Sequence, residues 1–250
     1  MEIVRNIAYA PEHGERGRLD LAFPHGASGR PVVMVVHGGG MRALSKARMD
    51  NVAAFVAEQG WAAVNVNYRL LSDHPYPAPL EDTLAAFEWI QETDEPRITR
   101  QDRSRVALLG ASAGGFLVLM MGFMLGPKRV RAIVDISGPT TRSRASAQSP
   151  REGKDPRLFY APVDLVGADT PPLLAVHSRV DGVVDPAEST AVVARVHQAG
   201  GQAELYSYDG PDRLHGIWQA QDDPHPRLLP HIEEKIAAFL RETLKVEREV

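Results

Sequence analysis

Gly110-Ala111-Ser112-Ala113-Gly114 lies between the apolar run Val106–Leu109 and Gly115–Leu125, a segment of helical character. A G-x-S-x-G pentapeptide between a strand and a helix presents its serine on a sharp turn at the carboxyl edge of a sheet. Small neighbours let the backbone approach closely, and the amides of the helix N-terminus favour developing negative charge. Ser112 is therefore the candidate nucleophile. The alternative is a glycine-rich turn that only permits close packing.

Apolar runs without polar alternation are typical of strands that are buried on both faces. Five runs have this character: Val32–Val36, Ala62–Val66, Val106–Leu109, Val130–Ile136 and Leu173–Val176. Segments with helical spacing of apolar residues separate or follow them: Ala47–Gln59, Leu80–Gln91, Gly115–Leu125, Pro186–His197 and Pro230–Leu244. This alternation predicts an α/β fold with a mostly parallel central sheet and helices on both faces. We expect Glu2–Tyr9 and Arg18–Phe23 to be antiparallel strands at one edge.

The chain length and composition fit one globular domain over residues 1–250. Residues 139–169 are rich in Pro, Ser, Arg and Asp and lack clear periodicity, so we expect a short lid over the active site within that domain. The chain has no cysteine, which rules out disulfides and thiolate chemistry. We recognise no secretory signal or membrane-spanning stretch and expect a cytoplasmic protein.

A run of three glycines, Gly38 to Gly40, follows His37 at the end of the strand Val32–Val36. Consecutive glycines expose backbone amides that can bind a tetrahedral oxyanion, and the amide after the nucleophile is a further donor. A phosphate-binding loop is the alternative, but neither of its glycine patterns fits here. We expect His37 itself to be structural.

The acid and the base of a serine hydrolase of this fold follow the nucleophile in that order. Asp181 lies in the loop after Leu173–Val176, whereas Asp185 directly precedes Pro186 and is explained as a helix N-cap. Of the nine histidines, His215 lies on a polar loop between the expected strand Ala203–Tyr208 and the last helix. We therefore expect Asp181 to orient His215, and His215 to activate Ser112. His177 is expected to pack around the acid loop.

Several motifs occur together in order: HGGG at 37–40, YRL at 68–70, HPYP at 74–77 with LED at 80–82, GASAGG at 110–115, SGP at 137–139 and HSRVDGVV at 177–184. This pattern resembles the hormone-sensitive-lipase-like and bacterial feruloyl-esterase-like carboxylesterases of the α/β-hydrolase superfamily, which border the arylformamidases and prolyl-oligopeptidase-type hydrolases. The resemblance spans roughly residues 19–216 and implies the triad Ser112, Asp181 and His215.

The same resemblance implies that the amides of Gly39, Gly40 and Ala113 form the oxyanion hole. It also implies that Arg69 and Asp82 form a buried structural ion pair. Where an aromatic residue often follows the glycines, this chain has Met41 and Arg42, which we expect to line the pocket mouth. Arg42, with Arg142 and Arg144, would favour an anionic substrate, unless these arginines are only solvated loop residues.

The function that the sequence predicts is hydrolysis of a carboxylic ester of small to medium acyl chain through an acyl-enzyme on Ser112. Cleavage of an amide, a formamide or a lactone by the same triad is an alternative. A catalytically silent small-molecule-binding protein on a hydrolase scaffold is another. We expect a small-molecule ester as partner, no cofactor, no metal, no nucleic acid and no membrane, because the charges are scattered and no ligand spacing is evident. Nothing in the sequence supports an oligomer.

Overall fold

The computed structural model describes residues 1–141 and 153–245. Its centre is an eight-stranded sheet in the order β1-β2-β4-β3-β5-β6-β7-β8. The strands are β1 (Glu2–Ala8), β2 (Arg18–Phe23), β3 (Pro31–Val36), β4 (Ala62–Val66), β5 (Asp102–Ala111), β6 (Ala132–Ile136), β7 (Leu173–Ser178) and β8 (Ala203–Tyr208). β2 pairs antiparallel with β1 and with β4, and all pairings from β4 to β8 are parallel. The predicted mostly parallel sheet with antiparallel strands at one edge is therefore confirmed.

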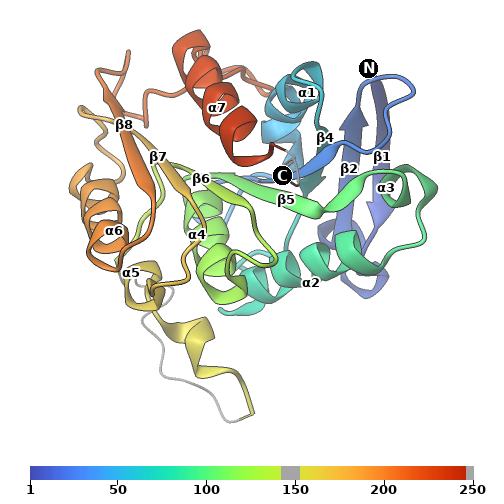
Figure 1. The fold of residues 1–250 in the computed structure, drawn as a ribbon, viewed down its shortest axis with the longest axis horizontal. Helices are drawn as coiled ribbons and strands as arrows, with labels where there is room; N and C mark the ends of the chain where they lie inside the picture. Colours follow the sequence, from blue (N-terminus) through green and yellow to red (C-terminus); the bar gives the residue numbers. More distant parts are fainter. Residues whose placement is uncertain (142–152, 246–250) are drawn as a thin grey trace, which may run out of the picture.

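Helices cover both faces of the sheet. The α-helices are α1 (Asp50–Glu58), α2 (Ala78–Glu92), α3 (Pro96–Thr99), α4 (Ala113–Leu125), α5 (Pro162–Leu165), α6 (Ala187–Gln198) and α7 (Pro230–Thr243). Three 3₁₀ helices, η1 (Pro11–Gly17), η2 (Lys46–Met49) and η3 (Pro156–Phe159), complete the described elements. α1 and α7 lie on one face, and α2, α4 and α6 lie on the other (Figure 1).

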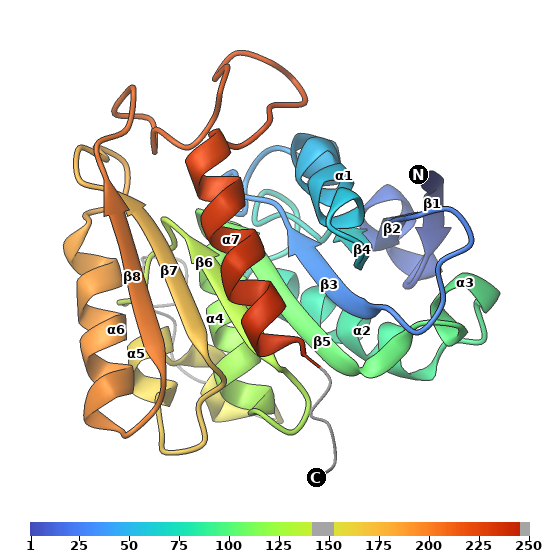
Figure 2. The ribbon, with the colours of Figure 1, turned by 45° about the horizontal axis from the view of Figure 1, so that its top comes forward.

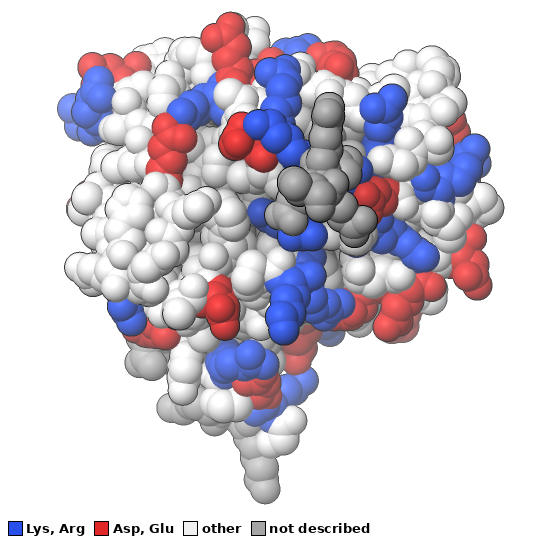
Figure 3. All heavy atoms as spheres, viewed as in Figure 1, with Lys and Arg blue, Asp and Glu red and all other residues white. Residues whose placement is uncertain are grey.

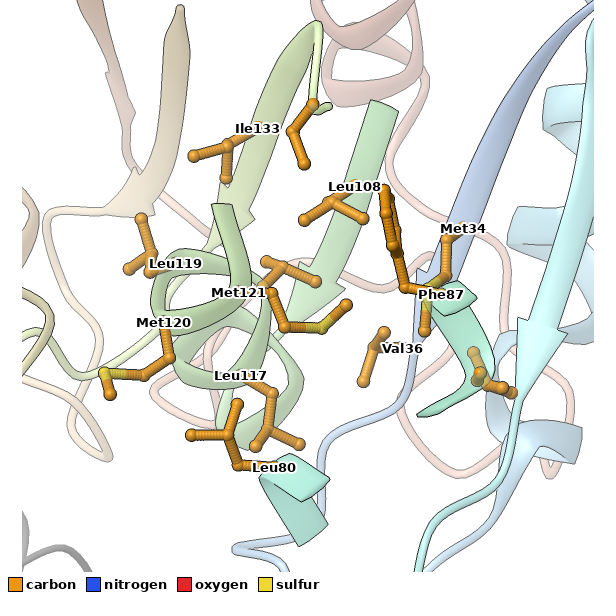
Figure 4. Packing of buried hydrophobic residues seen from close by; sticks show 14 of the residues in the cluster. Met34, Val36, Leu80, Phe87, Leu108, Leu117, Leu119, Met120, Met121 and Ile133 are labelled. Atoms are coloured by element: carbon orange, nitrogen blue, oxygen red, sulfur yellow. The ribbon is translucent and has the colours of Figure 1, made fainter. Parts of the chain in front are cut away.

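The two faces of the sheet bury separate apolar clusters because successive side chains of a strand point in opposite directions. In β3, Val33 and Val35 join the cluster under α1 and α7. Met34 and Val36 join the cluster on the other face, where they lie near Leu108 of β5 and Phe87 of α2 (Figure 4). This two-sided burial explains why the central strands have no polar alternation.

The described ends of the predicted lid contact the segment before α2 and the start of α6. The Tyr76 hydroxyl donates to the carbonyl of Leu158 at 2.6 Å, and its ring meets Phe159 edge-on. The amide and hydroxyl of Thr140 are both held by Glu188 of α6. Residues 142–152, which form the middle of the predicted lid, lie outside the described residues. The lid, like the single domain over 1–250, therefore stays a prediction.

A different segment rises above the carboxyl ends of the strands. It joins β8 to α7 and lies at the top of the molecule in Figure 2. Acidic and basic side chains are interspersed on the face drawn in Figure 3. In residues 1–141 and 153–245, no helix combines the length and apolarity that crossing a membrane requires.

Candidate active site

The turn between β5 and α4 holds Ser112 in an unusual backbone conformation, with φ 55° and ψ −120°. A residue with a side chain rarely adopts positive φ, so the surrounding packing must hold it there. The neighbouring glycines allow that packing. A Cβ on Gly110 would lie 2.2 Å from the carbonyl oxygen of Gly114, and a Cβ on Gly114 would lie 2.2 Å from that of Val36. The glycines of the motif are thus required by backbone contacts.

Ser112, His215 and Asp181 form one hydrogen-bonded chain although they are far apart in sequence. His215 Nε2 lies 3.1 Å from the Ser112 Oγ, and His215 Nδ1 lies 2.7 Å from Asp181 Oδ2. His215 has φ 72°, and the loop around it is fastened by Asp212, whose carboxylate accepts the amides of Leu214 and Gly216. The structure therefore brings the three expected residues into hydrogen-bond contact.

Both oxygens of the Asp181 carboxylate have hydrogen-bond partners. Its Oδ1 accepts the amides of Val183 and Val184, and its Oδ2 faces His215 and, at 3.3 Å, Nε2 of His177. Burial alone would raise the pKa of Asp181, but the hydrogen bonds from His177, His215 and the two amides outweigh it and hold the pKa well below its usual range. An ionised Asp181 only accepts hydrogen bonds, so its 2.7 Å contact with His215 requires a proton on Nδ1, and in the neutral imidazole the Nε2 lone pair then faces Ser112.

The glycine loop after β3 lies beside this chain. Gly39 and Gly40 have φ of 98° and 61°, and a Cβ on Gly39 would lie 2.2 Å from the carbonyl oxygen of Ala43. Within the described part of the chain, the amides of Gly39, Gly40 and Ala113 donate to no protein acceptor. These amides are thus free to donate to an incoming oxygen, as the donors of an oxyanion hole must be.

His37 and Tyr68 support the glycine loop from below. Their rings stack at 4.2 Å with an interplanar angle of 8°, and the Tyr68 hydroxyl donates to the carbonyls of His37 and Gly38. Burial lowers the pKa of His37 to about 3, so its ring is neutral. The expectation that His37 is structural agrees with this geometry.

A cavity of about 270 Å³ opens onto Ser112 and His215. Its other walls come from the glycine loop, from the segment that includes η2, and from the segment after His215. The lining residues are Gly38, Gly39, Gly40, Leu44, Arg48, Met49, Ala111, Ser112, Val183, Leu214, His215, Ile217, Trp218 and Gln221. The wall is mainly apolar beside the reactive groups.

Met41 and Arg42 do not line this cavity, which corrects the sequence-based expectation. Met41 follows two left-handed glycines and itself has φ 57°. This curl turns its side chain into the apolar cluster that also includes Tyr68 and Leu70, where it is 4% exposed. Arg42 is exposed to solvent and is not among the lining residues. Arg142 and Arg144 lie outside the described residues.

Sequence reasoning missed the cavity walls formed by Arg48 and by residues 217–221. One signal was present, because Ile217 and Trp218 are an apolar pair in a polar loop, separated from the expected base only by Gly216, and both are buried. The position of Arg48 carried no such signal. It lines the cavity because η2 runs beside the glycine loop, and this short helix was expected to be part of one longer helix.

The remaining predicted residues have clear partners. The Asp185 carboxylate accepts the Ala187 amide at the start of α6, as an N-cap does. Arg69 makes paired hydrogen bonds of 2.6 to 2.9 Å to Asp82, whose side chain is 1% exposed, so the implied buried ion pair is present. His177 bonds Ser189 and Val184 beside the acid loop. Within the described ranges, no cluster of three or more His, Asp or Glu side chains is placed to hold a metal ion.

Comparisons with known proteins agree with this architecture. The BD-FAE family model matches residues 19–196 of the chain. Carboxylesterase NlhH of Mycobacterium tuberculosis is 36% identical over 130 residues, which are 50% of this chain and 40% of that protein. Esterase LipI of the same organism is 33% identical over 153 residues, which are 54% of this chain and 45% of that protein. Both matches span less than half the length of these relatives.

Among solved structures, a truncated form of a carbohydrate esterase from gut microbiota is similar with a TM-score of 0.79, over 97% of this chain and 96% of that one. The sequence identity is 20%, so this likeness shows a shared fold. The family match covers most of the sheet, the nucleophile turn and the loop of Asp181. The chain therefore belongs to the BD-FAE family, and its fold is that of the α/β-hydrolases.

Proposed function

We propose that this protein is a carboxylesterase that forms an acyl-enzyme on Ser112. The observation that carries the proposal is the hydrogen-bonded chain from Ser112 through His215 to Asp181, beside three amides that are available to an oxyanion. A protein that only bound a ligand on this scaffold would not need these three side chains in hydrogen-bond contact beside the three amides. The relatives named carboxylesterase and esterase support the same reaction class.

In the first half of the reaction, the Ser112 hydroxyl loses its proton to His215 Nε2 as its oxygen attacks the ester carbonyl carbon. The carbonyl oxygen becomes an oxyanion and accepts hydrogen bonds from the amides of Gly39, Gly40 and Ala113. The intermediate collapses, the bond to the alcohol oxygen breaks, and protonated His215 gives its proton to the leaving alcohol. Asp181 stabilises the charged imidazole throughout and stays ionised.

In the second half, water takes the place of the alcohol. His215 removes a proton from the water as it attacks the acyl carbon, and the oxyanion again forms in the same place. Collapse breaks the bond to the Ser112 oxygen, which recovers its proton from His215, and the carboxylic acid leaves. No group other than substrate and water is consumed, so the cycle needs no cofactor.

The substrate is proposed to carry a small to medium acyl group. A cavity of about 270 Å³ lies just below the usual range of pockets for drug-sized ligands, which is roughly 300–1,000 Å³. Its apolar walls of Leu44, Met49, Ile217 and Trp218 suit hydrocarbon. Longer chains would have to extend past the rim into solvent and would gain little from further length.

The test is hydrolysis of 4-nitrophenyl esters from acetate to palmitate by the wild type and by Ser112→Ala, with equal folding checked by circular dichroism. We expect wild-type turnover that is best for short or medium chains, and a loss of at least about 10³-fold in the variant. Equal activity of both proteins would refute the role of Ser112. If both are inert towards esters but formanilide or lactone substrates are cleaved by the wild type alone, the triad acts on another acyl bond. If the wild type cleaves none of these substrates, the carboxylesterase proposal is wrong.

A further inference from the structure

Among the described residues that line the cavity, Arg48 is the one arginine or lysine. It lies in η2, and its guanidinium carbon is 5.2 Å from the centre of the Trp218 ring. Its two terminal nitrogens donate to the backbone carbonyls of Gln221, at 2.8 Å, and of Asp223. These contacts fix the guanidinium in place at the wall of the cavity.

The charge of Arg48 has no carboxylate in contact with it. Over residues 1–141 and 153–245, no Asp or Glu oxygen lies within 4.0 Å of its nitrogens, whereas Arg69, Arg129 and Arg227 each meet a carboxylate at 2.6 to 2.7 Å. Asp222 and Asp223 are near enough to act on Arg48 electrostatically, but both are exposed and Asp223 contacts it only through its carbonyl. Burial lowers the pKa of Arg48, although an arginine stays charged.

The cavity around Arg48 is otherwise mostly apolar, so its charge indicates the kind of ligand that the cavity would bind. Most of the other side chains that line the cavity are apolar, and among the described lining residues His215 is the only other one with a basic or acidic side chain. At the rim, Leu44, Val183 and Leu214 are 49%, 56% and 55% exposed, although large apolar side chains are mostly buried in this chain. A ligand of this cavity would therefore meet an apolar surface with one positive charge on it.

We propose that Arg48 binds a carboxylate of the substrate and that the cavity selects esters in which an apolar spacer separates this carboxylate from the reacting carbonyl. This inference rests on the proposed esterase function and names its substrate class. A fixed guanidinium binds a carboxylate through charge-assisted hydrogen bonds, and the apolar walls strengthen the attraction by excluding water. Hydrogen bonds of this kind correspond to a preference of about 10- to 100-fold in kcat/KM.

The test uses two matched pairs of esters, because the charge can lie on either side of the ester bond. The acyl-side pair is 4-nitrophenyl adipate monoester and its neutral analogue 4-nitrophenyl 5-carbamoylpentanoate. The alcohol-side pair is 4-carboxyphenyl acetate and 4-carbamoylphenyl acetate. The quantity measured is the ratio of kcat/KM between the carboxylate and the carboxamide of each pair. This ratio cancels any general effect of a variant on the reaction.

The ratio is measured for the wild type, Arg48→Met, Arg48→Lys and the matched control Arg100→Met, an exposed arginine just before β5 that does not line the cavity. In at least one pair we expect Arg48→Met to lower the ratio by about 10- to 100-fold, Arg48→Lys to keep part of it, and Arg100→Met to leave it unchanged. A ratio that Arg48→Met leaves unchanged in both pairs would overturn the proposal and make Arg48 only a clamp for residues 221–223.

A binding measurement separates this inference from the function on which it rests. Calorimetry of the same four esters with Ser112→Ala and with the Ser112→Ala, Arg48→Met double variant needs no turnover. Weaker binding of a carboxylate ester, and not of its carboxamide partner, in the double variant supports the site even if the wild type hydrolyses none of the esters. Equal binding of every ester by the two variants contradicts the site, whatever the wild type hydrolyses.

Discussion

Asp181 and Asp185 are four residues apart on one loop, yet their surroundings differ. Asp181 is buried against two histidines and two amides, whereas Asp185 is exposed and accepts the amide of Ala187. Replacing the residue that orients the imidazole costs catalysis, because the wrong tautomer faces the nucleophile. Replacing an N-cap costs helix stability only.

We therefore expect Asp181→Asn to lower kcat by about 10³- to 10⁴-fold, and Asp185→Asn to leave it within about twofold of the wild type. Steady-state kinetics on one short 4-nitrophenyl ester checks both variants. The reverse order, with Asp185→Asn the more damaging, would move the acid to the other carboxylate.

Asp135 of β6 is a fully buried carboxyl that the mechanism does not use. Burial raises its pKa to about 7, against the opposing effects of nearby His177 and of the Gly138 amide. The unfolded chain ionises this group near pH 4, so the folded protein holds an extra proton between about pH 4 and 7. The stabilisation from this proton is complete below pH 4 and is lost as the pH rises through 7.

Asp135→Asn removes this titration and keeps an oxygen for the Gly138 amide, which donates to Asp135 at 3.0 Å. Three units of pKa correspond to about 4 kcal/mol. The free energy of unfolding of the variant, minus that of the wild type, should therefore rise by up to about 4 kcal/mol between pH 4 and pH 8. Urea unfolding at several pH values measures it. Parallel curves for the two proteins would mean that Asp135 does not titrate in this range.

The sequence was most informative at residues where chain order and local context agree. Ser112, Asp181 and His215 each follow a recognisable strand, and parallel strands bring their carboxyl ends to one edge, where the structure joins the three residues. Met41 was misplaced because three consecutive residues with positive φ turn its side chain inward, and sequence spacing does not encode such a curl. Arg48 was missed because it meets the cavity wall beside Trp218, which is 170 residues away in sequence.

At the scale of elements, the contact between β3 and α4 depends on a glycine. Gly114 has ordinary backbone angles, but a Cβ there would lie 2.2 Å from the carbonyl oxygen of Val36. Neither atom belongs to a flexible side chain, so the helix or the strand must shift. Gly167, which has open space around its Cβ position and no positive φ, is a matched control.

We expect Gly114→Ala to lower the free energy of unfolding by about 3 kcal/mol or more, and Gly167→Ala to change it by less than about 0.5 kcal/mol. Chemical denaturation followed by fluorescence compares them. An alanine at 114 that is as stable as the wild type would show that β3 and α4 are not in such close contact.

Periodicity predicted the long elements well, because burial on one or both faces leaves a pattern. Ala62–Val66 and Ala203–Tyr208 have the expected bounds, and the major helices end within two residues of expectation. The short helices η1, α3, η3 and α5 were not expected, because segments of four to seven residues are too short to show a helical period. The helix expected over Ala47–Gln59 is divided into η2 and α1, and this division sets the position of Arg48.

At the scale of the molecule, a buried ionic group fastens the antiparallel edge of the sheet to the segment that carries η2. Lys46 is 8% exposed, and its amine donates to Asp20 of β2 at 2.8 Å and to Asn6 of β1 at 2.9 Å. Its backbone amide also donates to Asn67, directly after β4. Nothing in the sequence pattern predicted this connection, because it joins segments through a single polar side chain.

Lys46→Met should lower the free energy of unfolding by about 2–3 kcal/mol, because Asp20 stays buried with less compensation. Arg5 and the Asn6 amide still bind that carboxylate, which keeps the loss below that of an isolated charge. Lys245→Met removes an exposed pair with Glu242 and should have no measurable effect. Thermal and urea unfolding of both variants check the difference. Equal stability of the two would mean that the buried group does not hold the edge in place.

The proposed mechanism depends on attack by Ser112 on the substrate. Mass spectrometry of the protein after treatment with a fluorophosphonate, which transfers its phosphonyl group to an activated serine with loss of fluoride, tests this attack. We expect one adduct per chain, on the peptide that contains Ser112, with ester hydrolysis lost in the same proportion. We also expect no adduct in Ser112→Ala. An adduct on another residue, or full hydrolysis that persists with Ser112 labelled, would contradict the mechanism.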